Sequence, residues 1–241
     1  MPVNLRFEEL YNQIELVRGI GDRRRGRLCI MSFVTFLAGE AHSDNPATVS
    51  SVIRRLAIEI NDNMPASLRQ KLKCFAPQMI GTRDGHDNAR ARLLLDVARK
   101  ELLPHVESDL GDITPTTQFG VREGAAKSWL MYLHVKSLVA GVEVIGDAQA
   151  QEQIAFAMAR LICGCGQNVA SPAKRGWYWA MAIDLLDRLC TIGIEDKRPT
   201  VPEDQIDALS DFLAKRQRML ARRRGTKYLW TRVRSLVATL G

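Results

Sequence analysis

An apolar run from residue 28 to residue 38 limits the possible folds of this chain more than any other stretch. Its two exceptions, Ser32 and Thr35, carry hydroxyls that can bond a carbonyl one turn back. A helix that is apolar on all sides is normally buried in a core, and the run is far shorter than the ~20 residues that span a bilayer. We therefore predict a buried central helix that begins near Asp22, a capping residue, and ends at Gly39, a left-handed glycine.

A polar turn follows this predicted helix and ends at Pro46. Two interpretations of its Glu40, His42 and Asp44 are open. Carboxylate and imidazole groups are suitable for a metal or acid/base site. The interpretation that we favour is a turn between two helices, in which Asp44 or Asn45 caps the next helix and Glu40 accepts hydrogen bonds from nearby backbone.

A second polar junction lies at residues 82–87. In one interpretation His86 and Asp87 join the first junction and form a metal-assisted hydrolase site, where one carboxylate activates water. In the other, which we favour, Asp84 and Asp87 only start a helix, where the helix dipole favours negative charge. The alternative site would consist of Glu40, His42, Asp44, Asp62, His86 and Asp87.

The first junction and its surroundings also carry a family resemblance. The residues concerned are Cys29, Met31, Leu37 to Glu40, Ser43, Asp44, Pro46, Asn61 and Asp62, followed by 80–82 and 89–90. Over about residues 20–100 the chain resembles a group of uncharacterised bacterial proteins, many of them actinobacterial. Their pattern is Cys-Leu-Met, Leu-Ala-Gly-Glu, Ser/Thr-Asp-x-Pro and Asn-Asp. Ile30 departs from it, since Leu is usual there. The resemblance implies no activity, and it directs attention to the region from Glu40 to Asp62.

The rest of the chain predicts helices and no strand of useful length. The expected helices cover residues 4–18, 47–62, 66–75, 87–103, 121–145, 149–162, 172–192 and 203–224, with a last one after Gly225-Thr226. We expect Pro77 and Pro104 to end the helices before them. The fold class is therefore all-α, a multi-helix bundle of about nine or ten helices. Its predicted domain is 1–214, with a seam at 107–118 and a basic helical extension at 215–241.

The Cys-x-Cys spacing of Cys163 and Cys165 can bind a metal, but we favour the end of a helix. Cys163-Gly-Cys-Gly predicts the end of a helix, because a closed zinc site needs four ligands and only Cys190 follows. We expect His134 to lie on a long core helix without being a ligand. Five cysteines, an odd number, are typical of reduced thiols. With charged residues among the first twenty and no signal-peptide pattern, they predict a cytoplasmic protein. We expect no cofactor.

The positive charge is concentrated in one segment. The chain has a net charge of +7, and the residues from 215 onward contain nine cations and no acid. The cations are Lys215, Arg216, Arg218, Arg222, Arg223, Arg224, Lys227, Arg232 and Arg234. Three partners are considered: nucleic acid, with Tyr228 and Trp230 stacking on bases; an acidic protein surface; and, less favoured, an anionic membrane.

Together these patterns favour a non-enzymatic binding or accessory protein. Its basic C-terminal helices would contact an anionic partner, either nucleic acid or an acidic protein. The metal-assisted hydrolase is the alternative. The two hypotheses differ in whether the six residues of the alternative site converge on one another.

Overall fold

The computed structural model describes residues 11, 13–113, 123–141, 146–193, 201 and 203–238. Side chains at 110–113, 123–126, 220 and 222–238 lie outside this description. The chain is 75% helical, which agrees with the predicted all-α class. Within the described ranges the helices form eight continuous segments, fewer than the nine or ten expected.

The N-terminal part of the fold is a small sheet, which the sequence did not predict. Strand β1 (Glu15–Leu16) pairs in parallel with β3 (Arg27–Leu28), and β2 (Gly21–Asp22) pairs with β3 in the antiparallel sense. The helix predicted through residue 18 is therefore wrong beyond residue 13, and its first residues lie outside the described chain. Strands this short show no alternation of polar and apolar residues, so a pattern search cannot detect them.

The central helix is confirmed, but it starts later than expected. Helix α2 (Ile30–Leu37) is entirely buried. Cys29 caps it by accepting a hydrogen bond from the Ser32 amide at 3.2 Å. Asp22 instead caps the short 3-10 turn η1 (Arg23–Arg25). Gly39, with φ of 72°, ends the helix as predicted.

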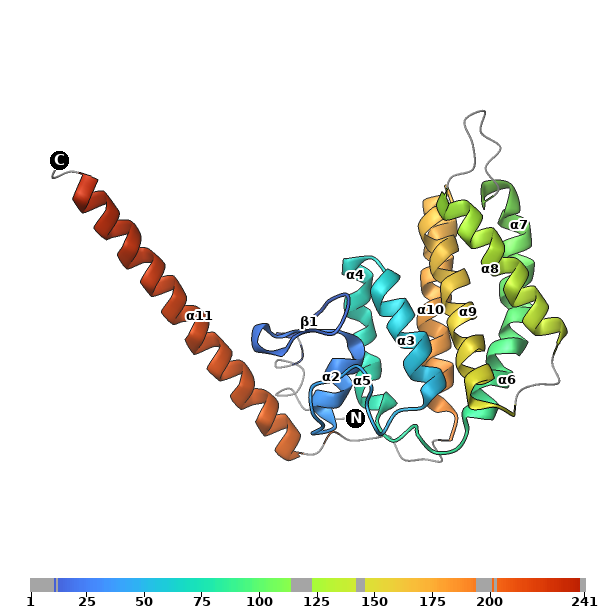
Figure 1. Cartoon of the computed structure of the whole chain (residues 1–241), viewed down its shortest axis with the longest axis horizontal. Coiled ribbons are helices and arrows are strands. Elements are labelled where there is room, and N and C mark those ends of the chain that lie inside the picture. Colours follow the sequence, from blue (N-terminus) through green and yellow to red (C-terminus); the bar gives the residue numbers. More distant parts are fainter. Residues whose placement is uncertain are drawn as a thin grey trace.

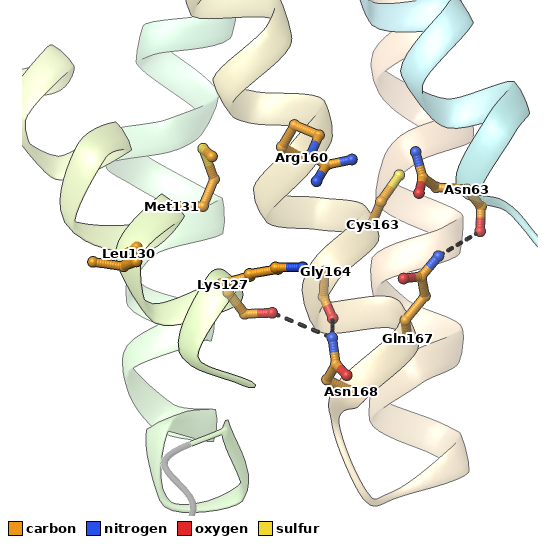
Figure 2. A pocket seen from close by; sticks show the side chains of 10 residues that line it. Asn63, Lys127, Leu130, Met131, Arg160, Cys163, Gly164, Gln167 and Asn168 are labelled. Atoms are coloured by element: carbon orange, nitrogen blue, oxygen red, sulfur yellow. Dashed lines mark hydrogen bonds between the residues drawn. The ribbon is translucent and has the colours of Figure 1, made fainter. Parts of the chain in front are cut away.

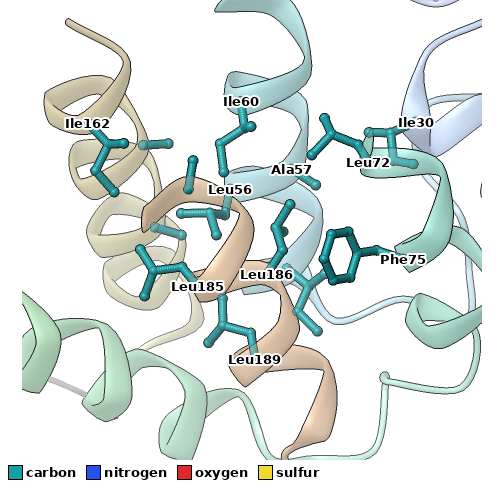
Figure 3. Packing of buried hydrophobic residues seen from close by; sticks show 14 of the residues in the cluster. Ile30, Leu56, Ala57, Ile60, Leu72, Phe75, Ile162, Leu185, Leu186 and Leu189 are labelled. Atoms are coloured by element: carbon teal, nitrogen blue, oxygen red, sulfur yellow. The ribbon is translucent and has the colours of Figure 1, made fainter. Parts of the chain in front are cut away.

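Three helices pack together at the centre of the core. Helix α3 (Ser51–Asn63) lies against α9 (Ala148–Asn168) and α10 (Pro172–Thr191). In Figure 3, Leu56 and Ile60 of α3 lie among Leu185 and Leu186 of α10 and Ile162 of α9. Ser50, rather than Asp44 or Asn45, caps α3. Ser171 and Pro172 start α10 as the sequence indicated.

Two prolines that were expected to end helices do not. Helix α4 (Ala66–Arg69), the 3-10 turn η2 (Gln70–Phe75) and α5 (Ala76–Met79) follow one another, with Pro77 in the first turn of α5. Helix α6 (Asp87–Val97) likewise passes through the π-helical turn η3 (Ala98–Leu102) into α7 (Leu103–Ile113), which contains Pro104. Proline is tolerated in a first helical turn, where its missing N–H would have no partner. The predicted seam therefore begins inside α7, and 114–118 lie outside the described residues.

The glycines of the Cys163-Gly-Cys-Gly motif lie inside α9 and do not end it. A Cβ at Gly164 would come 2.7 Å from Ser128 Oγ of α8 (Glu123–Ala140), and one at Gly166 would come 2.8 Å from the Trp179 ring of α10. Both glycines thus permit close helix approach. Helix α8 is a core helix on one face only, since Tyr132 and Val135 are buried whereas Leu130 is 64% exposed and His134 is exposed.

The last helix, α11 (Glu203–Ala238), is continuous through Gly225, where a break was predicted. Ile206, Leu209 and Leu213 of its first part are buried, and Phe212 lies 5.4 Å from Phe36 of α2 between ring centroids. Beyond this contact α11 leads away from the bundle (Figure 1). No helix in the described ranges has the length and apolar character needed to cross a membrane.

Candidate functional site

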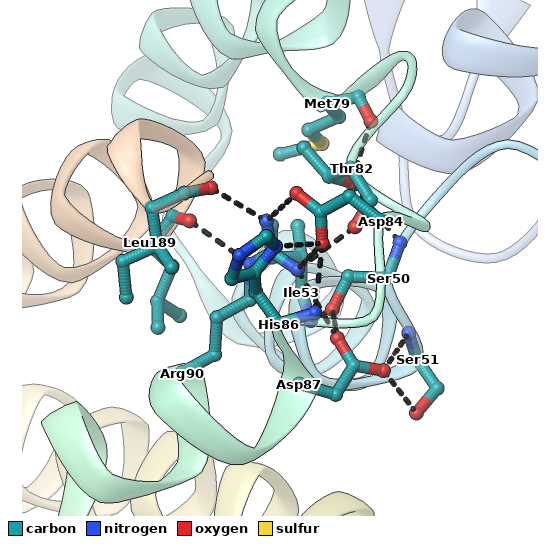
Figure 4. A network of polar contacts seen from close by, with 11 residues as sticks. Ser50, Ser51, Ile53, Met79, Thr82, Asp84, His86, Asp87, Arg90 and Leu189 are labelled. Carbon is teal, nitrogen blue, oxygen red and sulfur yellow. Dashed lines mark hydrogen bonds and ion pairs between the residues drawn. The ribbon is translucent and has the colours of Figure 1, made fainter. Parts of the chain in front are cut away.

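The junction at residues 82–87 is organised around Arg90, whose side chain is completely buried (Figure 4). Its Nη1 and Nη2 donate to the two carboxylate oxygens of Asp84 at 2.7 and 2.8 Å. It also donates to three carbonyls, those of Thr82 (2.8 Å), Leu189 (3.2 Å) and Ile192 (2.7 Å). One side chain on α6 thus connects the 82–87 turn to the end of α10.

The carboxylate of Asp84 is held ionised by this contact. Burial opposes ionisation, but hydrogen bonds from Arg90 and from the His86 backbone, with the Arg90 charge, lower the pKa of Asp84 to about 2. His86 Nδ1 lies 3.3 Å from Asp84, and the His86 side chain is half-exposed. Because Arg90 binds both oxygens of Asp84 and the pKa of this carboxyl is lowered to about 2, the carboxylate is a weak base and serves as an anchor.

Asp87 belongs to the same network, since Arg90 Nη1 lies 3.3 Å from its Oδ1, and it extends the network to the start of α3. It accepts a hydrogen bond from Ser50 Oγ and further bonds at 3.3 Å from the Ser51 amide and hydroxyl. The sequence placed Asp87 at a helix start, and the structure adds that the helix whose N-terminus it satisfies is α3.

The other residues of the alternative site each have their own local role. Glu40 accepts bonds from the Ala47 amide (2.8 Å) and the Thr48 hydroxyl (3.1 Å), the turn role that the sequence favoured. Asp62 accepts from the Gly19 amide at 2.9 Å. His42 and Asp44 are exposed. In the part of the chain that the structure describes, no three His, Cys, Asp or Glu side chains are grouped so that they could hold a metal ion.

The sequence analysis missed a second buried carboxylate, Asp109 on α7. Its side chain is 2% exposed and receives the Tyr178 hydroxyl at 2.9 Å and the Lys174 ammonium at 2.9 Å, both from α10. His105 Nε2 lies 3.5 Å away, and its ring stacks on Trp177 at 3.6 Å between centroids. Burial opposes ionisation, but these partners lower the pKa of Asp109. Sequence spacing links only His105 with Asp109, one turn apart, and cannot identify partners on α10.

The basic segment, residues 215–234, belongs to α11. Lys215 and Arg218 are exposed, whereas Arg216 donates to the Gln13 carbonyl at 3.0 Å and lies against Gly26. The side chains of Arg222, Arg223, Arg224, Lys227, Arg232 and Arg234 lie outside the described side chains. The first residues of the segment therefore still contact the N-terminal part of the fold, through Arg216 and Gln217.

Fold and contacts together define a helical bundle with a small N-terminal sheet and a long basic helix. Comparison with known proteins gives no matching family model, no matching curated protein and no matching solved structure. The resemblance over residues 20–100 therefore stays an expectation from the sequence.

Proposed function

We propose that this protein is a non-enzymatic nucleic-acid-binding protein that contacts the phosphate backbone through the basic segment of α11. The observation that carries the proposal is the course of α11, which contacts the rest of the fold as far as Arg216 and Gln217 and then leads away from it (Figure 1). Seven of the nine cations of the segment, from Arg218 onward, follow that point, and no acid accompanies them.

Packing and charge divide α11 into two parts. The part through Leu213 fixes the helix against α2, where Arg23 lies over the Phe36 ring at 4.2 Å and near Phe212. The basic segment extends the same helix, so its backbone is already ordered before a partner binds. Less conformational entropy is then lost on binding than for a disordered basic tail.

The distribution of the cations suits a helix lying in a groove. At helical spacing the nine positions fall on all sides of α11 and do not form one stripe. The major groove of duplex DNA admits an α-helix, with phosphates on both walls. Cations on opposite sides of one helix can therefore contact both backbones, and each contact releases counterions.

The test is binding of the full chain to a duplex of about 20 base pairs and to a single strand of similar length over a salt series. The variant carries Arg222→Gln, Arg223→Gln and Arg224→Gln. The control carries Lys71→Gln, Arg92→Gln and Lys100→Gln, which remove the same charge from exposed positions of the bundle. We expect the arginine variant to lower the slope of log K against log salt by about 3, and the control to leave it nearly unchanged.

Two outcomes would reject the proposal. Absence of binding at low salt would remove nucleic acid as the partner. Binding to poly-glutamate as tight as binding to the duplex, with the same loss in the arginine variant, would indicate an acidic protein instead.

A further inference from the structure

A turn of three arginines lies against the beginning of the basic segment of α11. The 3-10 turn η1 (Arg23–Arg25) connects strands β2 and β3, and Gly26 follows it. A Cβ at Gly26 would come 2.5 Å from the Arg216 guanidinium, so the turn and the helix touch at this point. In Figure 1 the sheet that carries the turn lies beside α11. Two basic segments from distant parts of the chain are therefore neighbours.

The sheet register places this turn, and not the opposite end of the sheet, next to α11. Gln13 comes shortly before β1 and Gly26 directly before β3, and the two strands are parallel, so both residues lie at the same end of the sheet. The Gln13 carbonyl accepts a hydrogen bond from Arg216 at 3.0 Å, which confirms that this end faces α11. Arg18 follows β1 at the other end of the sheet and is exposed.

Arg24 is the arginine of the turn that has no acidic partner. Arg25 lies 3.2 Å from Asp22, and the Arg23 guanidinium lies over the Phe36 ring at 4.2 Å. The carboxylate of Asp22 also accepts the Arg24 backbone amide at 2.9 Å, so it is committed to the turn and to Arg25. The Arg24 side chain is exposed and makes no ion pair or hydrogen bond with any described residue.

Several other arginines at the surface differ in this respect. Arg160, which lies beside the hollow between α8 and α9 in Figure 2, is 3.7 Å from Glu59. Arg188 has two carboxylates within 3.3 Å. An arginine with such partners gains little from a phosphate, because the existing ion pair must be weakened first. Arg24 can bind an anion without losing a partner.

On α11 a row of basic positions leads away from this turn. At about 100° per residue, positions 223, 227 and 234 fall on the same side of the helix as position 216, and they are Arg, Lys and Arg. With a rise of ~1.5 Å per residue, position 227 lies roughly 16 Å beyond position 216 along the helix. A duplex covers that distance in about five base pairs.

We infer that η1 is a second phosphate-contacting element for the nucleic acid that binds α11, with Arg24 as the contact residue. This inference rests on the function proposed above, and it specifies that one backbone of the duplex passes η1. The arginine turn contacts this backbone near the beginning of the basic segment, and α11 contacts it further along. Such a contact positions the duplex and adds affinity without sequence preference.

The test is duplex binding of the full chain over a salt series, with three single substitutions. Arg24→Gln should lower the slope of log K against log salt by about 1, the loss of one phosphate contact. Arg24→Lys should keep the slope, because counterion release depends on the charge. Arg18→Gln, the matched control at the other end of the sheet, should leave the slope unchanged. Thermal unfolding of each variant checks that the fold is kept.

The outcomes separate this inference from the function on which it rests. If Arg222→Gln, Arg223→Gln and Arg224→Gln together lower the slope and Arg24→Gln does not, nucleic-acid binding stands and the role of η1 is rejected. If the natural chain does not bind the duplex, both are rejected. Equal losses in Arg24→Gln and Arg18→Gln would indicate a general effect of charge and overturn the inference. Two duplexes bound per chain at saturation would show two separate sites and overturn it as well.

Discussion

Arg90 and Asp84 form a two-pronged ion pair, with Nη1–Oδ1 at 2.7 Å and Nη2–Oδ2 at 2.8 Å, and the Arg90 side chain has no exposed surface. The same guanidinium donates to carbonyls on either side of the junction between α6 and α10. A buried charge is tolerated only when its partners are complete. The pair is therefore a structural connection on which several predictions depend.

Replacing Arg90 with Met should destabilise the protein by about 3–5 kcal/mol, because Asp84 and the three carbonyls would lose their donor. The measurement is urea unfolding followed by circular dichroism. Arg92→Met, two residues away and exposed, should change the free energy of unfolding by less than about 0.5 kcal/mol. Equal effects of the two substitutions would show that the Arg90 contacts are not stabilising.

Acid should lower the free energy of unfolding, because it protonates Asp84. Its pKa is lowered from 3.8 to about 2 by folding, so the unfolded state binds the proton more readily. The stability from this group is complete above about pH 4 and is lost as the pH falls towards 2.

The check is urea unfolding at a series of pH values, compared between the natural chain and Asp84→Asn. The variant should be less stable at neutral pH and lose less stability on acidification. The pKa of Asp109 is also lowered, so part of the acid dependence should remain. An unchanged pH profile in Asp84→Asn would contradict the prediction.

Substitution of Gly193 by Ala should be more damaging than substitution of Gly85 by Ala. Both glycines have left-handed backbone, with φ of 81° and 82°, so both variants carry the strain of about 1 kcal/mol for an L-residue there. At Gly193 the new Cβ would also collide with the Asp84 carboxylate, whereas at Gly85 nothing lies within 4 Å. Thermal unfolding of the two variants separates collision from strain; equal losses would exclude the collision.

Two tyrosines allow a comparison of a hydrogen bond to a buried carboxylate with one to an exposed carboxylate. Tyr178 donates to Asp109, whose side chain is 2% exposed, and Tyr132 donates to Glu107, whose side chain is 46% exposed. Because hydrogen bonds to buried charges are less replaceable by water, Tyr178→Phe should cost about 1.5–3 kcal/mol and Tyr132→Phe under about 1. Chemical denaturation of both variants gives the comparison. A larger loss at Tyr132 would contradict this ranking.

Local sequence patterns correctly predicted those helix ends that depend only on neighbouring residues. The ends of α2 at Gly39 and the start of α10 at Ser171-Pro172 depend on backbone conformation within a few residues. Elsewhere in the chain, proline and glycine residues were less reliable as predictors of where a helix ends. Pro77, Pro104, Gly164 and Gly225 all lie inside helices. For the first three, which lie in helices packed on the bundle, favourable packing can offset a weak local preference.

The junction around Arg90 shows the same difference between local signals and long-range contacts. Asp84 and Asp87 were identified as residues of a helix start, but their partners Arg90 and Ser50 were not. The contact of Asp87 with Ser50 depends on how α3 and α6 pack. Two of the three carbonyls that Arg90 binds, those of Leu189 and Ile192, lie at the end of α10, about a hundred positions later in the chain. The pair of Asp109 and Tyr178 escaped prediction for this reason.

The sequence by itself determined the helical class, the buried character of α2 and the concentration of cations after residue 214, because composition and helical spacing are properties of the chain alone. Only the tertiary structure decided that residues 15–28 form a sheet, that Arg90 is buried in an ion pair, and that α8 and α9 approach closely at Gly164. These features arise from contacts between distant segments, and their free energy exists only after the helices have packed.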